Sequence, residues 1–179
     1  MKIKLASFIV SAALLVPATA MANTPVQLSV PGVNLPAGNV SGVRLNLLYG
    51  QTSQVEGVNF SLLGLSTISN FTGLNFGLAF GVNHTTSSMT GLEFGLANWN
   101  EGNATGADFG LVNYTGNNFT GAQFGTFNYA GSLNGLQFGF VNATDHINKG
   151  VQIGLINYDK SGTFVSKNLP IFPIINARF

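Results

Sequence analysis

The sequence predicts an all-β protein, namely a parallel β-solenoid of about eight 15-residue coils with a cap at each end. Three observations support this prediction. An eight-residue phrase recurs along most of the chain, apolar and other residues alternate with a period of two inside each copy, and clusters of Asn, Gly, Ser and Thr separate the copies. Such a pattern is typical of short strands joined by turns and repeated at a fixed interval.

The repeat has its clearest form as Gly-x-x-Phe-Gly-x-x-Asn, and Ile153 replaces Phe in the last copy. Copies start at Gly42, Gly57, Gly73, Gly91, Gly106, Gly121, Gly135 and Gly150. The spacing is 14 to 16 residues, except for 18 residues between the third copy and the fourth. A period this regular indicates that each copy is one structural unit stacked on its neighbours.

Each copy is expected to be extended rather than helical. In the copy that starts at Gly91, Leu92, Phe94 and Leu96 alternate with Gly, Glu and Gly. A period of two is the period of a β-strand, in which successive side chains point to opposite faces. A helix is disfavoured because each glycine in its interior costs about 1 kcal/mol.

Identical residues recur at the same position of successive copies, which predicts ladders of like side chains about 4.8 Å apart. The phenylalanines are expected to fill the inside of the coil, and the asparagine amides to bond to one another along the axis. The predicted ladder residues are Asn98, Asn113, Asn128, Asn142, Asn157, Phe94, Phe109, Phe124 and Phe138.

One further column holds acids and amides. Because it accepts both kinds of side chain, we predict an outward, solvated row that serves as a candidate interaction face. Its members are Glu93, Asp108, Gln123, Gln137 and Gln152.

The chain divides into four parts. Residues 1–22 read as a signal peptide, residues 23–41 as a proline-rich cap, residues 42–168 as the β repeat domain, and residues 169–179 as a second cap. Prolines exclude a helix and a central strand, so both flanking segments are expected to cover an end of the stack.

The signal peptide predicts export to the periplasm, outer membrane or cell surface of a Gram-negative bacterium. Lys2 and Lys4 precede an apolar run over residues 5–16, and Ala20-Met21-Ala22 forms a cleavage site. Without this segment the chain carries five basic and six acidic residues, so no basic face for nucleic acid is expected.

We predict neither an enzyme nor a cofactor or metal site. There is no cysteine, and the two histidines, His84 and His146, lie in expected turns where a solvated role is the simplest. Four threonines precede successive glycines, which leaves an ice-binding or carbohydrate-binding solenoid as a remote alternative. These are Thr72, Thr90, Thr105 and Thr120.

A small outer-membrane β-barrel acting as a pore or anchor is the competing architecture, so membrane association stays open. Leu92, Phe94 and Leu96 would face lipid, and the chain ends in Phe179 as such proteins often do. A 15-residue period leaves only tight turns on both sides, whereas these barrels have long loops on one side. A barrel also has no need for an asparagine in every strand.

The repeated phrase, together with the ending Leu169-Pro-Ile-Phe-Pro173, resembles the bacterial surface-repeat family first noted in leptospiral surface proteins. The resemblance covers residues 42–179. It implies an exported repeat protein without an assigned reaction. We therefore expect a structural or interaction role with an unidentified partner in the envelope or at the surface.

Overall fold

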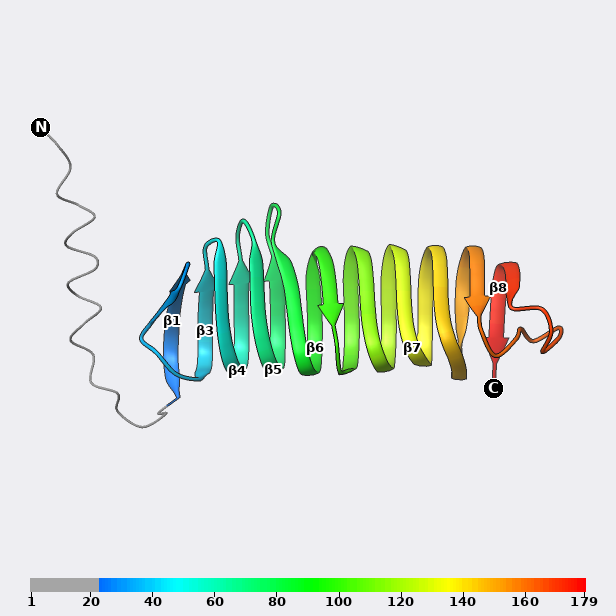
Figure 1. Cartoon of the computed structure of the whole chain (residues 1–179), viewed down its shortest axis with the longest axis horizontal. Helices are drawn as coiled ribbons and strands as arrows, with labels where there is room; N and C mark the ends of the chain where they lie inside the picture. Colours follow the sequence, from blue (N-terminus) through cyan, green and yellow to red (C-terminus); the bar gives the residue numbers. More distant parts are fainter. Residues whose placement is uncertain (1–22) are drawn as a thin grey trace, which may run out of the picture.

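The computed structural model describes residues 23–179, and the predicted signal peptide lies outside them. Over this range the protein is an all-β parallel solenoid (Figure 1), which confirms the predicted fold class. The strands are β1 (Thr24–Val30), β2 (Val33–Leu35), β3 (Val40–Asn46), β4 (Tyr49–Ser61), β5 (Leu65–Gly77), β6 (Val82–Asn100), β7 (Asn103–Asp159) and β8 (Ile171–Arg178). They form one sheet in the order β2-β1-β3-β4-β5-β6-β7-β8.

Neighbouring copies of the repeat run in the same direction and in register. Gly42 pairs with Gly57, Gly57 with Gly73, and the same alignment continues to Gly91 and Gly106 along β3 to β7. The long strand β7 then winds through the remaining copies. The barrel alternative is therefore wrong, because an up-and-down barrel requires antiparallel neighbours.

The first glycine of each copy lies where successive coils come closest. A Cβ atom on Gly121 would lie 1.9 Å from the carbonyl oxygen of Gly106, and the φ angle of Gly121 is +134°. Seven of the eight repeat glycines have such positive φ angles, Gly150 being the exception. No side chain fits at this contact, which explains why glycine recurs there.

The predicted asparagine ladder is present in the structure. Asn98 Nδ2 donates to Asn113 Oδ1 at 2.9 Å, and the same bond repeats from Asn83 to Asn157. Asn98 Nδ2 also donates to the backbone oxygen of Phe109 in the next coil at 3.1 Å. Each asparagine side chain therefore donates one hydrogen bond to the next asparagine and one to a backbone carbonyl oxygen at the bend.

The second glycine of the phrase makes room for this ladder. A Cβ atom on Gly110 would lie 2.9 Å from Asn113 Oδ1 and 3.0 Å from Asn98 Nδ2. The second glycine and the asparagine of the phrase therefore recur together, because the asparagine side chains occupy the space that a Cβ atom on the glycine would need.

The phenylalanine column lies on the outside of the coil, so its predicted burial is wrong. Phe94, Phe109 and Phe124 are half-buried and Phe138 is exposed. The rings stack on one another, with centroids 4.8 Å apart for Phe94 and Phe109 and 5.0 Å apart for Phe109 and Phe124. Around the first glycine, the side chains that point inside are those two residues before it and two residues after it.

One apolar column forms most of the hydrophobic part of the interior. It consists mainly of the residue two positions before each glycine, and every member is at most 1% exposed. Its members are Val40, Val55, Phe71, Met89, Ala104, Phe119, Leu133 and Ile147. Ile68 and Ala130 are buried outside this column, and the rest of the interior is largely polar.

Both flanking segments cover an end of the stack, but each does so with a strand. β1 pairs with β2 and β3, so the expectation that prolines exclude a central strand is wrong here; Pro25 is accommodated at a register irregularity. β8 pairs antiparallel with the last coil of β7, and Pro173 lies beside another irregularity. Short or proline-containing edges hinder pairing with further chains.

The Asn113→Leu substitution should destabilise the solenoid. Leucine matches asparagine in shape, but it leaves the backbone oxygen of Phe124 and Asn128 Oδ1 without their donor. Unpaired buried groups of this kind cost about 1–3 kcal/mol each, so we expect the melting temperature to fall by roughly 5–15 °C. Thermal unfolding followed by circular dichroism measures it.

The matched control is Asn117→Leu, because Asn117 is exposed. That variant should stay within about 0.5 kcal/mol of the parent chain. Equal melting temperatures for the two variants would contradict a stabilising role of the ladder.

Candidate interaction face

The predicted interaction face lies inside the molecule and not on its surface. Glu93, Asp108, Gln123, Gln137 and Gln152 are all 0% exposed. The position two residues after the repeat glycine points inward, so the prediction of a solvated row is wrong. These residues belong to a continuous buried column, called here the interior column, which also contains Gln27, Arg44, Asn59, Asn75 and Asn176.

In the N-terminal half of the interior column, the hydrogen bonds run from Arg44 toward the middle. Arg44 donates to Asn59 Oδ1 at 3.1 Å, and Asn59 donates to Asn75 Oδ1 at 2.7 Å. Asn75 Nδ2 then donates to Glu93 Oε1 at 2.8 Å. Arg44 also donates to Gln27 Oε1 at 3.1 Å, and burial lowers its pKa to about 10. A side chain with donors only is the natural start of such a chain.

In the C-terminal half the direction is reversed. Asn176 donates to Gln152 at 3.2 Å, and Gln152 donates to Gln137 at 2.9 Å. Gln137 donates to Gln123 at 2.9 Å, and Gln123 donates to Asp108 Oδ2 at 3.4 Å.

The two chains of donors converge on Glu93 and Asp108, which are register partners in adjacent coils. A point that receives donors from both sides needs acceptors, and carboxyl groups supply them. Burial raises the pKa of Glu93 to about 7, and burial together with the charge of Glu93 raises the pKa of Asp108 well above its usual value. A proton retained by one carboxyl group relieves the repulsion between them.

His84 is buried and paired, contrary to the prediction of a solvated histidine. Its ring stacks on Trp99 with centroids 4.2 Å apart, and Nε2 lies 3.0 Å from Glu101 Oε1. Nδ1 lies 3.2 Å from Thr67 Oγ1. These contacts hold a bulge in β6, where two residues lie opposite one residue of β5.

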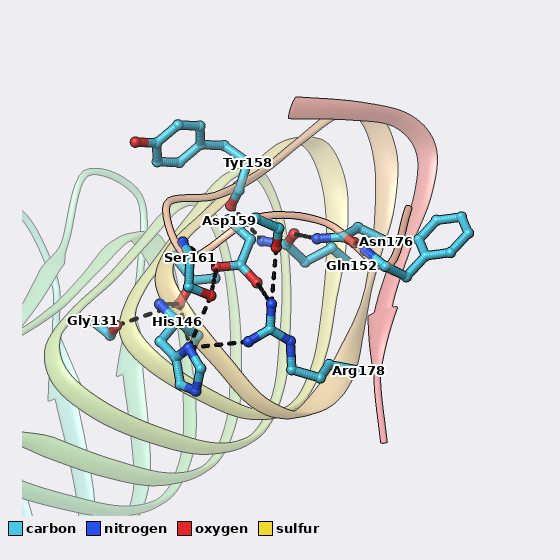
Figure 2. A network of polar contacts seen from close by, with 11 residues as sticks. Gly131, His146, Gln152, Tyr158, Asp159, Ser161, Asn176 and Arg178 are labelled. Carbon is cyan, nitrogen blue, oxygen red and sulfur yellow. Dashed lines mark hydrogen bonds and ion pairs between the residues drawn. The ribbon is translucent and has the colours of Figure 1, made fainter. Parts of the chain in front are cut away.

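A second polar cluster lies at the C-terminal end and ties β8 to the last coil (Figure 2). Ser161 Oγ donates to Asp159 Oδ1 at 2.6 Å, and His146 Nδ1 lies 2.9 Å from the same hydroxyl. Arg178 reaches Asp159 Oδ2 at 3.5 Å and His146 Nδ1 at 3.3 Å. His146 itself is exposed, as expected.

This cluster contains the three residue types of a serine hydrolase in a different order. In a catalytic triad the histidine stands between the serine and the carboxylate, which orients it as a base. Here Ser161 stands between Asp159 and His146, and an arginine contacts the histidine. The arrangement closes the end of the solenoid.

The outward positions of the repeat make up an extensive apolar surface. Positions six and seven of the phrase, called here the apolar edge, carry no charged residue in any copy. They are Leu47, Leu48, Leu62, Leu63, Leu78, Ala79, Leu96, Ala97, Leu111, Val112, Thr126, Phe127, Phe140, Val141, Leu155 and Ile156. The phenylalanine column adjoins this edge on one side.

An aromatic row adjoins the apolar edge on the other side, at the position after the asparagine. It consists of Trp99, Tyr114, Tyr129 and Tyr158. The rings of Tyr114 and Tyr129 stack with centroids 5.0 Å apart, and Trp99 pairs in register with Tyr114. Each ring of the row is half-buried or exposed.

The apolar edge projects furthest in the first copies. The connections from β3 to β4, β4 to β5 and β5 to β6 extend beyond one side of the stack (Figure 1). Their side chains are exposed, by 50% for Leu48, 56% for Leu63 and 71% for Phe80. Phe80 follows Ala79, which has a φ angle of +52°, and the ladder asparagine of this copy is Asn83, three residues further along.

A shallow groove of about 490 Å³ lies beside the apolar edge at its C-terminal end. Phe138, Phe140, Leu155 and Ile174 line its walls, and glycines form part of its lining. Thr126 contributes to the groove because it is shorter than the leucine or phenylalanine found at this position in the other copies.

The threonine row is exposed and in register from Thr72 through Thr90 to Thr105. Glu56 precedes it in the same column, and Asn134 and Lys149 follow it. Four threonines in single file make a narrow row compared with the apolar edge.

Comparison with protein-family models, curated proteins and solved structures gave no match to this chain. Among residues 23–179 there is no helix with the length and apolar character needed to cross a membrane.

The stability of the solenoid should fall as the pH rises from about 5 to 8. The pKa of Glu93 is raised from 4.5 to about 7, so between these values the folded state binds more protons than the unfolded state. The stability that depends on protonated Glu93 is fully present below a pH of about 4.5. It is lost as the pH rises through about 7 and Glu93 ionises. The loss should be on the order of 3 kcal/mol, measured by urea unfolding at each pH.

Asp108→Asn should flatten this pH profile and raise the melting temperature at pH 8. The amide can donate to Glu93 while still accepting from Gln123, without a second charge. The control Glu56→Gln removes an exposed acid and should leave the profile unchanged. A profile for Asp108→Asn as steep as that of the parent chain would refute the coupling of the two carboxyl groups.

Proposed function

We propose that this chain is an exported, non-enzymatic β-solenoid with a structural or interaction role in the cell envelope, and that its contact surface is the apolar edge. The observation that supports this most is an apolar exterior on a molecule whose interior is largely polar. Over eight coils, the apolar edge together with the adjoining phenylalanine column (positions four to seven) covers about 500 Å². The largest apolar patch on a typical soluble monomer covers about 300–600 Å² and often has a function.

The polar clusters support a non-enzymatic role. Glu93 and Asp108 are enclosed within the coil and bonded to amides, so a substrate has no route to them. Ser161 and His146 take part in the closure of the C-terminal end. Each cluster is accounted for by the stability of the solenoid.

Export is supported by the first 22 residues of the sequence, with their basic start, apolar run and Ala20-Met21-Ala22 site. The near balance of five basic and six acidic residues in the remaining chain fits a contact that does not depend on net charge.

Deletion of residues 5–16 should keep the protein in the cytoplasm with its N-terminus uncleaved, because the apolar run is the part recognised for secretion. The unmodified chain should instead be recovered from the envelope or periplasm with Asn23 as its first residue. Cell fractionation and mass spectrometry of the purified chain measure both properties. Recovery of the unmodified chain from the cytoplasm with Met1 intact would refute export.

A further inference from the structure

The apolar edge requires a partner that offers no hydrogen bonds. Protein–protein interfaces carry about one hydrogen bond per 100–200 Å², and even homodimer interfaces are only about 65% apolar. Among its residues the apolar edge has a single polar side chain, Thr126. This composition suits hydrocarbon better than the surface of another protein.

The shape of the edge agrees with a fluid partner. The connections from β3 to β4, β4 to β5 and β5 to β6, which contain Leu48, Leu63 and Phe80, project beyond the coils of β7, so this side of the solenoid is uneven along its length. A protein surface would need a matching relief to pack against it, whereas lipid chains adapt to the contour.

Part of the backbone at the edge is already hydrogen-bonded, which favours contact with lipid. In the projecting connections, Leu62 N donates to Asn46 O, Leu63 N to Leu47 O, and Leu78 N to Ser61 O, at 2.7 to 3.1 Å. These bonds run from one coil to the next, so the amide groups of Leu62, Leu63 and Leu78 keep their partners when the side chains enter hydrocarbon.

The aromatic row and the charges are arranged as a membrane interface requires. Tryptophan and tyrosine favour the headgroup level, where one end of the ring is apolar and the other hydrated. The exposed charges, among them Glu56, Glu101 and Lys149, lie at other positions of the repeat.

We propose that the apolar edge inserts into the surface of a phospholipid bilayer, with the aromatic row at the level of the headgroups. The solenoid then lies on one leaflet as a peripheral rod. This inference rests on the proposed role of the edge as a contact surface, and it specifies what the edge contacts. Because the edge is uncharged, binding should require no anionic lipid and should not weaken as salt is added.

The test uses the chain in the form that cells accumulate, purified without detergent, and large vesicles of phosphatidylcholine. Trp99 is the single tryptophan of the sequence and belongs to the aromatic row, so its fluorescence reports directly on the contact. We expect flotation with the vesicles, a blue shift of the emission, and quenching by lipids brominated near the headgroup more than by lipids brominated at the chain end.

A triple variant, Leu63→Asp, Leu111→Asp and Leu155→Asp, places charges along the edge at residues that are 56% to 64% exposed. It should weaken vesicle binding at least about tenfold while melting like the parent chain. The control is Ser53→Asp, Ser87→Asp and Asn117→Asp, which adds the same charge at exposed positions elsewhere and should bind within about twofold of the parent.

Equal vesicle binding by both triple variants, or no binding by the parent chain, would overturn the inference. In the second case, light scattering separates the remaining possibilities. A concentration-dependent dimer that the edge variant abolishes would retain the proposed contact role with a second copy as the partner. A monomer that neither binds vesicles nor self-associates would overturn the contact role as well.

Discussion

Two columns of hydrogen-bonded side chains run through the interior of this solenoid, and the other features of the repeat follow from them. The asparagine ladder and the interior column need coils that are in register and spaced closely enough for one amide to reach the next. That spacing brings the backbones into contact at the repeat glycine, where a Cβ atom would overlap a carbonyl oxygen. The glycines and asparagines are therefore consequences of a single geometric constraint.

The same constraint explains why so much apolar surface lies outside. A 15-residue coil has a narrow interior, and two of its columns are occupied by amides and carboxyl groups. Apart from Ile68 and Ala130, the buried apolar side chains belong to a single column, from Val40 to Ile147. Hydrophobic residues make up 45% of the sequence, so most of the leucines and phenylalanines of the repeat must stack on the exterior.

The repeat, the register and the parallel direction could be predicted, because the eight-residue phrase carries them in its spacing and in its recurring asparagine. Which residues of each strand face the interior could not be predicted, because a period of two fits either assignment of faces. Hydrophobicity favoured burying Phe94 and exposing Glu93, whereas the structure buries Glu93 completely and leaves Phe94 half-buried on the exterior. One available signal was that Arg44, two acids and several amides share one column, which suits a column of donors and acceptors that bond among themselves.

The direction of the hydrogen bonds along the interior column also limits the order in which the coils can stack. Arg44 donates to both of its neighbours in the column, whereas the pair Glu93 and Asp108 accepts hydrogen bonds from both sides. The order of donors and acceptors along the axis therefore determines which coil can stack on which. A slip by one coil would place donor against donor or leave a carboxyl group without its amide, at a cost of about 1–3 kcal/mol for each buried group. The repeats are nearly identical on their apolar exterior, which distinguishes poorly between registers. The specificity of the fold therefore comes from its polar interior, and this leaves the exterior residues free to serve a contact.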